Sequence, residues 1–239
     1  MSKEVFRSAS EEREHEQTQW MPVSDLMAGL MMVFLFIAVA LMHHVQAENE
    51  AITDVAETYR NKQQAIVTAL NTEFEKDFEG WGAELDRETL MITFQSPDIN
   101  FAQGSTRLPQ RYKDILDDFF PRYMKVLDAF HDAIDEIRIE GHTSSDWQVG
   151  IGPDQSYFRN MNLSQGRTRT VLNHVYNLPE VVSYRPWIKS NIAAVGLSSS
   201  KLILNEDGFE DKERSRRVSF RVISNADEQI KKIEKLEGS

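Results

Sequence analysis

Two groups of residues in this chain of 239 residues have types and spacings that could do chemistry. The first is Asp25, which comes one residue before an uncharged stretch from Leu26 to Met42. A carboxylate beside hydrocarbon is costly unless it is paired, hydrated or protonated. If Asp25 faces a protein partner or a narrow water path, it can alternate between its neutral and charged forms and carry protons. The alternative is that Pro22 begins a helix and Asp25 only complements the dipole of its first turn.

The second group surrounds Arg167. Residues 137–146 (IRIEGHTSSD) predict a strand that ends in a polar loop, and residues 160–175 (NMNLSQGRTRTVLNHV) predict a helix that starts near Leu163. Arg167 would then lie one turn into this helix, opposite the loop. A guanidinium there can bind a carboxylate in bidentate fashion, and backbone N–H groups of the loop can add hydrogen bonds. The pattern predicts a site for an anionic ligand, with an ordinary surface salt bridge of Arg167 as the alternative.

Other kinds of chemistry have little support in the sequence. The chain has no cysteine, which excludes disulfides, thiolate zinc sites and thiol catalysis, and it has no nucleophile elbow, phosphate-binding Gly-rich loop or His-Glu-x-x-His pair. Glu140, His142 and Asp146 could supply metal ligands, but such clusters at a strand end often occur by chance. The net charge of −11 argues against nucleic acid as a partner. We therefore expect neither an enzyme nor a bound cofactor or metal.

A membrane helix would have to position Asp25. Residues 20–43 are predicted to form a single transmembrane helix, because residues 21–42 at ~1.5 Å each span roughly 33 Å, about one bilayer core. A cleaved signal peptide is the alternative, but the polar N-terminal segment 1–19 holds more acidic than basic residues. Three basic residues precede the helix and two follow it within twenty positions, so the charge bias toward a cytoplasmic N-terminus is slight.

Residues 44–83 are predicted to form a linker helix. Apolar residues recur there at steps of three, four and seven, at Ile52, Val55, Tyr59, Ile66, Leu70, Phe74 and Phe78. This stripe could pair with a second copy of the chain or with the domain that follows. The alternative is an ordinary surface helix of that domain.

Residues 84–224 are predicted to form a compact α+β domain, followed by a charged tail at 225–239. The expected order β-α-β-α-β-β implies helices that cover one face of a mixed sheet. The predicted strands are residues 90–94, 134–140, 192–196 and 217–223. One predicted helix begins at Pro109, a second covers 163–177, and a polar loop covers 144–154.

Three motifs of this domain resemble the C-terminal, peptidoglycan-binding domain family of OmpA over roughly residues 88–223. They are Gly-His-Thr at 141–143, Asn-x-x-Leu-Ser-x-x-Arg at 160–167 and Arg-x-Arg-Arg-Val at 214–218. The resemblance implies that the domain binds the peptide stem of peptidoglycan through Thr143, Asn160, Leu163 and Arg167. In the family an Asp usually follows Gly-His-Thr and, with the Arg, holds the diaminopimelate. This chain has Ser144 there, and Asp146 could substitute from two residues on.

The membrane segment is similar to the single helix of MotB-type stator subunits, in which an Asp follows a Trp and precedes a Met-Met-x-Phe run. Trp20, Asp25 and residues 31–34 fit that pattern, and the Asp-Leu-Met form resembles the ZorB family of the Zorya anti-phage defence system. This resemblance implies that Asp25 accepts protons and that the chain is a homodimer within a pentamer of a ZorA-type (MotA-like) membrane protein. It also implies an inner-membrane location with the N-terminus in the cytoplasm and the domain in the periplasm. A flagellar stator subunit and a passive cell-wall tether are the alternatives.

Overall fold

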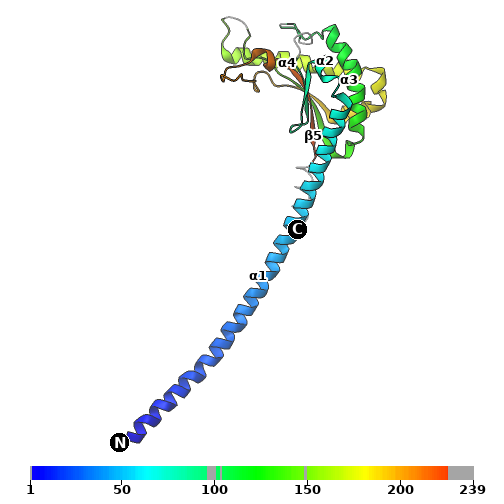
Figure 1. The fold of residues 1–239 in the computed structure, drawn as a ribbon. Helices are drawn as coiled ribbons and strands as arrows, with labels where there is room; N and C mark the ends of the chain where they lie inside the picture. Colours follow the sequence, from blue (N-terminus) through cyan, green and yellow to red (C-terminus); the bar gives the residue numbers. More distant parts are fainter. Residues whose placement is uncertain (1, 96–100, 103, 148–149, 226–239) are drawn as a thin grey trace. The chain divides into compact units, whose positions relative to one another are not determined.

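The computed structural model describes residues 2–95, 101–102, 104–147 and 150–225, and their side chains from residue 25 onward except 47–52, 54–56 and 59. The chain divides into an N-terminal unit and a domain unit that begins at Val55. The predicted membrane segment and most of the predicted linker belong to one continuous helix, α1 (Ser2–Phe74), shown in Figure 1. The prediction that the linker helix continues to residue 83 is wrong, because a turn follows Phe74 and the short helix α2 and strand β1 come after it. No Gly or Pro lies between Gly29 and Gly80, so nothing in the local sequence interrupts the helix from residue 30 to its end at Phe74.

Helix α1 contains one segment long and apolar enough to cross a membrane, Asp25–Gln46, with a mean hydropathy of 2.4. None of this segment is buried within the chain. The apolar N-terminal helix that the sequence predicts is therefore present, and its side chains are left to contact lipid or another protein.

The domain contains a five-stranded mixed sheet with the order β1-β2-β5-β3-β4. Strand β3 is parallel to β4, and the other neighbours are antiparallel. The strands are β1 (Ala83–Asp86), β2 (Met91–Phe94), β3 (Ile134–Gly141), β4 (Ile192–Gly196) and β5 (Val218–Ser224). Four of them are the predicted strands. Strand β1 is not among the predicted strands, because its sequence Ala-Glu-Leu-Asp has no β-branched or aromatic residue and its conformation depends on pairing with β2.

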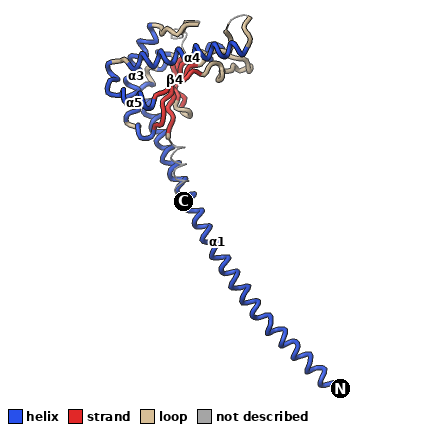
Figure 2. The backbone as a smooth tube through the Cα atoms, turned by 180° about the vertical axis from the view of Figure 1, so that it is seen from behind, coloured by secondary structure: helices blue, strands red, loops and turns tan. Residues whose placement is uncertain are grey.

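The longer helices of the domain are α3 (Gln110–Asp128) and α4 (Pro153–Tyr176), and the shorter ones are α2 (Phe78–Trp81), α5 (Arg185–Asn191) and α6 (Lys212–Ser215), with 3₁₀ turns at His131–Ala133 and Pro179–Tyr184 (Figure 2). Helix α3 begins after Pro109, as predicted. The predicted start of the next helix near Leu163 is wrong, because α4 begins at Pro153. A proline suits the first helical turn, and Gly152 before it ends the loop. The segment between β3 and α4 therefore ends at Gly152, two residues before the predicted end of the polar loop at Asp154.

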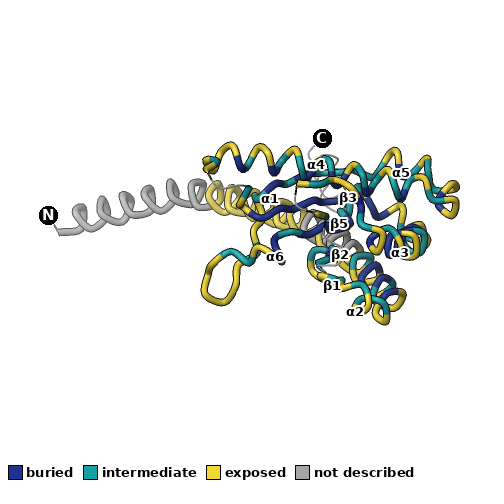
Figure 3. The backbone as a smooth tube through the Cα atoms, turned by 90° about the horizontal axis from the view of Figure 1, so that it is seen from above, coloured by how far each residue is buried: buried dark blue, intermediate teal, exposed yellow. Residues whose placement is uncertain are grey.

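The helices cover one face of the sheet, as the element order predicts. Phe119 of α3 lies 5.1 Å, between ring centroids, from both Phe94 of β2 and Phe220 of β5. Strand residues one position away, such as Thr93 and Ser219, point to the opposite face and hydrogen-bond to each other at 3.0 Å. Buried positions, dark blue in Figure 3, run through the strands and recur along α3. The apolar core thus lies between the sheet and the helices.

The end of α1 is part of this core. Ile66, Val67, Leu70 and Phe74 are all buried, and the Phe74 ring centroid lies 5.2 Å from that of Phe119. The second half of the apolar stripe therefore packs against the domain that follows it, which is one of the two partners that the sequence left open. The side chains of Ile52, Val55 and Tyr59 lie outside the described residues, as does the tail from 226 onward. The core begins before the predicted domain boundary at residue 84.

Candidate functional site

A cleft of about 1460 Å³ lies where β3 and the loop 142–152 meet helix α4. Every residue of the predicted binding site lines it: Thr143, Ser144, Asp146, Asn160, Leu163 and Arg167. They come from two segments that the parallel βαβ arrangement brings together, the C-terminal end of a strand and the helix that follows it. The structure therefore gathers these residues around one opening.

A pair of glycines sets how closely α4 approaches the sheet. Gly141 of β3 and Gly196 of β4 are paired in the sheet. A Cβ atom added at Gly196 would lie 2.3 Å from the backbone nitrogen of Gln165, and one added at Gly141 would lie 2.9 Å from the carbonyl oxygen of Ser164. No larger residue fits this contact without a shift of α4. Since Arg167 lies within the same helical turn, these glycines also determine where its guanidinium lies.

Asn160 holds the loop against the helix. Its Nδ2 donates hydrogen bonds to the carbonyl oxygens of Ser144 at 3.1 Å and Asp146 at 3.2 Å, and its residue is only 2% exposed. The backbone N–H of Thr143 donates to the carbonyl oxygen of Ser198 at 2.9 Å on the other side. Asn160 is therefore placed to shape the loop that lines the cleft.

Arg167 lies at the floor of the cleft and is 7% exposed. Its Nε donates to the carbonyl oxygen of Ser105 at 3.0 Å, and its Nη2 donates to that of Ala102 at 3.2 Å. The guanidinium also lies 4.9 Å from the centroid of the Phe101 ring. Burial and, after it, the charge of Arg216 lower the pKa of Arg167 to about 10. An anion beside Arg167 would reverse this destabilisation of the charged form.

Among the described residues, Arg167 does not form the surface salt bridge that is the alternative for it. Within the described part of the chain, no carboxylate lies within ion-pair distance of its guanidinium. Among the described residues its guanidinium bonds only to neutral carbonyl oxygens, so burial destabilises its charge with no counter-ion to compensate. It is therefore suited to bind a carboxylate from outside the chain.

The acidic residue of the loop, Asp146, already has a partner. Asp146 lines the cleft and forms an ion pair with Lys212, and its side chain is 62% exposed. Ser145, which lies between Ser144 and Asp146, donates its backbone N–H to Glu210 at 2.8 Å. The loop is thus tied to the segment that precedes β5. Asp146 lines the cleft, as it would have to if it substituted for the family's Asp, but Lys212 balances its charge.

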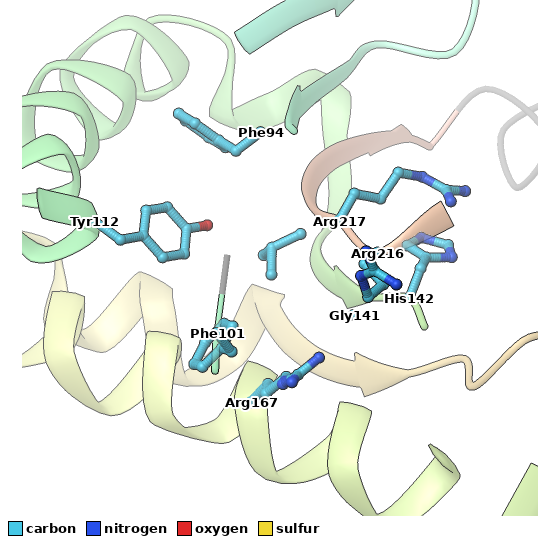
Figure 4. A pocket seen from close by; sticks show the side chains of 9 residues that line it. Phe94, Phe101, Tyr112, Gly141, His142, Arg167, Arg216 and Arg217 are labelled. Carbon is cyan, nitrogen blue, oxygen red and sulfur yellow. The ribbon is translucent and has the colours of Figure 1, made fainter. Parts of the chain in front are cut away.

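A smaller pocket adjoins the cleft and shares Phe101, Arg167 and Arg216 with it (Figure 4). Phe94 and Tyr112 lie on one side of this pocket, and His142, Arg216 and Arg217 lie on the other. Arg216 is not among the binding residues that the sequence predicts. It lies in the Arg-x-Arg-Arg-Val motif, which supports the family resemblance but does not by itself show which arginine lines the cleft.

His142 is buried beside Glu140, with Nε2 at 3.5 Å from Oε2 of the carboxylate. Burial lowers the pKa of His142, although the contact with Glu140 opposes this shift. Neither ring nitrogen has a hydrogen-bond partner among the described atoms. The described residues contain no group of three or more His, Asp or Glu side chains placed to hold a metal ion.

Asp25 belongs to the other unit of the chain. It is the first residue of the apolar segment of α1, and its side chain is exposed. The large apolar residues that follow are exposed as well, for example Phe34 at 72%. In the described chain nothing covers Asp25 or the apolar surface beside it.

Comparison with known proteins gives one close relative in sequence. The chain is 53% identical over 221 residues to the Zorya protein ZorB of Escherichia coli, a match that covers 92% of this chain and 94% of the relative. No family model matches the chain.

Solved structures with a similar arrangement are more distant. A MotB-like protein from Desulfovibrio vulgaris has 18% identity and a TM-score of 0.47, over 72% of this chain and 94% of its own. The periplasmic domain of Helicobacter pylori MotB has 14% identity and a TM-score of 0.46, over 65% of this chain and 89% of its own. The cell wall anchor of the type VI secretion system of Pseudomonas aeruginosa has 16% identity and a TM-score of 0.41, over 65% of this chain and 96% of its own.

Proposed function

Since the chain belongs to the ZorB family of Zorya proteins, we propose that it is a membrane-anchored, peptidoglycan-binding stator subunit of an anti-phage defence complex. The domain holds the cell wall in the periplasm, and α1 crosses the inner membrane with its N-terminus in the cytoplasm. Two copies assemble with a ring of a ZorA-type membrane protein, which the sequence resemblance gives as a pentamer. Family membership favours defence over the flagellar alternative.

The observation that carries wall binding is the buried guanidinium of Arg167, which lines the cleft and pairs with no carboxylate among the described residues. A peptide stem of the wall offers carboxylates, and a carboxylate on Arg167 gains charge-assisted hydrogen bonds in a partly desolvated site. Asn160 keeps the loop in place, so that Thr143 and Ser144 line the opposite side. In this proposal Leu163 and Asp146 complete the lining, and Ser144 occupies the position where the family usually has an Asp.

Wall binding is tested with the full chain in detergent and purified sacculi, by measuring the fraction that sediments with the sacculi. We expect Arg167→Ala to reduce that fraction at least tenfold, because the ligand carboxylate loses its buried partner. Arg169→Ala is the matched control, since Arg169 lies on the same helix, is exposed and removes the same charge. Thermal unfolding by circular dichroism checks that both variants fold. Equal sedimentation of the wild type and Arg167→Ala would remove the site.

Proton transfer by Asp25 is the second part of the proposal. A carboxylate at the membrane edge is costly unless a partner or water pairs with it, and an exposed apolar surface surrounds Asp25 in the chain by itself. The partner ring would cover this surface and alternately shield and hydrate Asp25, so that proton passage drives movement of one component against the other. The wall-bound domain supplies the fixed point that such movement needs.

The experiment for Asp25 compares Asp25→Asn with Asp25→Glu in cells that carry the partner protein and are challenged with phage. Asn cannot exchange a proton, so we expect it to abolish protection, whereas Glu keeps an ionisable carboxyl and retains part of it. If Asn protects as well as the wild type, the chain acts as a passive tether and the proton-carrying role is wrong. Immunoblots of the membrane fraction show whether each variant reaches the membrane in equal amount.

A further inference from the structure

Arg216 lies beside Arg167, and both line the cleft and the smaller pocket next to it. Arg216 belongs to the segment between α6 and β5, whereas Arg167 lies on α4, so the two arginines reach the smaller pocket from different elements (Figure 4). Burial and, after it, the charge of Arg216 lower the pKa of Arg167, as expected for two guanidinium groups that line the same pocket. Two cations held together in this way favour an anion between them.

Among the described residues, the acidic side chains around the cleft do not supply that anion, and this includes Glu213, which lines the cleft but lies beyond ion-pair distance of both guanidinium groups. Asp146 pairs with Lys212, and Glu210 accepts hydrogen bonds from Ser145. Glu140 lies beside His142 and, at 3.9 Å, Arg221 on the other face of the sheet. In the parts of the chain that the structure describes, no carboxylate pairs with Arg167 or Arg216.

The neighbours of Arg216 in sequence, Arg214 and Arg217, do not face the cleft. Arg217 donates to the carbonyl oxygens of Ser215 at 3.2 Å and Lys201 at 3.1 Å, and it lines only the smaller pocket. Arg214 is exposed and lines neither opening. Of the three arginines in this segment, Arg216 is the one that faces the cleft.

The backbone that carries Arg216 is held in place on both sides. The side chain of Asp211 caps α6 by accepting hydrogen bonds from the backbone N–H groups of Glu213 and Arg214 at 3.1 and 3.0 Å. The buried hydroxyl of Ser215 accepts a hydrogen bond from the backbone N–H of Ile203 at 2.9 Å. Arg216 therefore starts from a rigid backbone position, which reduces the entropy lost when its side chain binds a ligand.

We propose that Arg167 and Arg216 bind one ligand carboxylate between them, so that the cleft selects peptidoglycan stems with a free carboxylate over stems in which that group is an amide. This inference rests on the proposed wall-binding function and adds a second cation and a chemical selectivity to it. A carboxylate offers acceptor lone pairs to both guanidinium groups, whereas an amide is neutral and turns an NH₂ donor toward donors. The selectivity comes from leaving the buried guanidinium of Arg167 and the half-buried guanidinium of Arg216 without an acceptor.

The test uses the full chain in detergent and two preparations of the same sacculi, one untreated and one with its carboxyl groups converted to amides by carbodiimide and ammonia. We expect amidation to reduce sedimentation of the wild type at least tenfold. Arg216→Ala should reduce sedimentation with untreated sacculi at least tenfold and change little with amidated sacculi. Arg216→Lys should lie between the two, because an ammonium keeps the charge but not the bidentate geometry.

The matched control is Arg214→Ala, which removes the same charge two residues away and should sediment like the wild type. Thermal unfolding of each variant shows whether it folds. If Arg216→Ala binds untreated sacculi as the wild type does while Arg167→Ala does not, the two-arginine site is wrong and the proposed function stands. If neither substitution weakens binding, or the wild type does not sediment, the proposed function fails as well. Unchanged wild-type binding after amidation would overturn the carboxylate selectivity.

Discussion

The guanidinium of Arg122 on α3 lies 4.9 Å from the centroid of the Phe74 ring at the end of α1. The same guanidinium pairs with Glu73 at 2.7 Å and Asp77 at 2.8 Å, and it donates to the carbonyl oxygen of Glu73 at 2.8 Å. One side chain thus binds the last turn of α1 and the turn that follows it, through two ion pairs, a hydrogen bond to a carbonyl oxygen and a cation–π contact. Arg122 fastens the end of the long helix to the core of the domain.

We expect Arg122→Ala to lower the free energy of unfolding of the domain by about 1 to 3 kcal/mol. The ion pairs are partly exposed and contribute only part of this, and the rest comes from the lost contact with the Phe74 ring. Urea titration followed by circular dichroism measures the change. Lys125→Ala, an exposed substitution on the same helix, is the control and should change stability by less than about 0.5 kcal/mol. Equal effects of the two substitutions would contradict the role of Arg122.

A fragment that begins at residue 84 should not fold by itself. It lacks Ile66, Val67, Leu70 and Phe74, which are buried in the core, and burial of each such side chain stabilises by about 1.5 to 3 kcal/mol. That loss is comparable to the entire stability of an ordinary domain. A fragment that begins at residue 60 keeps these residues and should fold. Amide NMR spectra of the two fragments show whether each one folds. Well-dispersed spectra from the shorter fragment would show that α1 is dispensable for the core.

Gly196→Ala should displace helix α4 and weaken wall binding. The new Cβ would lie 2.3 Å from the backbone nitrogen of Gln165, which cannot move without the helix. We expect a loss of about 1 to 3 kcal/mol in stability and a severalfold loss of sedimentation with sacculi. Gly152→Ala is the control, because a Cβ there meets no atom within 4 Å and the backbone is in an ordinary conformation. If both substitutions are tolerated alike, the glycine pair does not set the position of α4.

His142 should make the domain less stable as the pH falls from about 7.5 to 5. Burial lowers the pKa of His142 in the folded state, so the unfolded chain takes up a proton below about pH 6.5 while the folded chain resists it. The loss is about 1.4 kcal/mol for each unit by which the two pKa values differ. Glu140, whose pKa is lowered by His142 although burial raises it, loses its contribution only at more acidic pH.

The measurement is the free energy of unfolding at several pH values for the wild type and His142→Gln. The groups that face His142, namely Glu140, Arg217 and Lys201, are kept in both proteins. We expect a flatter pH dependence in the variant, whereas the exposed control His131→Gln should keep the slope of the wild type. Parallel slopes in all three proteins would show that His142 does not titrate differently in the folded state.

The proposed topology can be read from single cysteines, because the chain has none of its own. Ser8→Cys precedes the apolar segment, and Ser183→Cys lies at an exposed position of the domain. In spheroplasts, a membrane-impermeant maleimide should label Ser183→Cys, and should label Ser8→Cys only after the membrane is permeabilised. The reverse pattern would invert the orientation, and labelling of both without permeabilisation would argue against a membrane span.

Local residue patterns were enough to predict most of the elements and the residues that gather in the cleft. The apolar run of α1 and the strands β2, β3, β4 and β5 each depend on periodicity within one segment, which the sequence displays directly. The motifs around Thr143 and Arg167 also lie within single segments. Their spacing placed them at a strand end and on the next helix, which the parallel connection brings to one edge of the sheet.

Contacts between distant segments could not be predicted in this way. That Asp146 is paired with Lys212, that Arg216 lies beside Arg167, and that the end of α1 is buried all depend on how segments tens of residues apart pack together. The first turns of α4 were missed because their residues are polar and show no apolar stripe, so the helix is stabilised there by its start at Pro153 and by contacts such as that of Asn160 with the loop. Charge balance and burial at the cleft are properties of that packing, and they determine which arginine is free to bind a ligand.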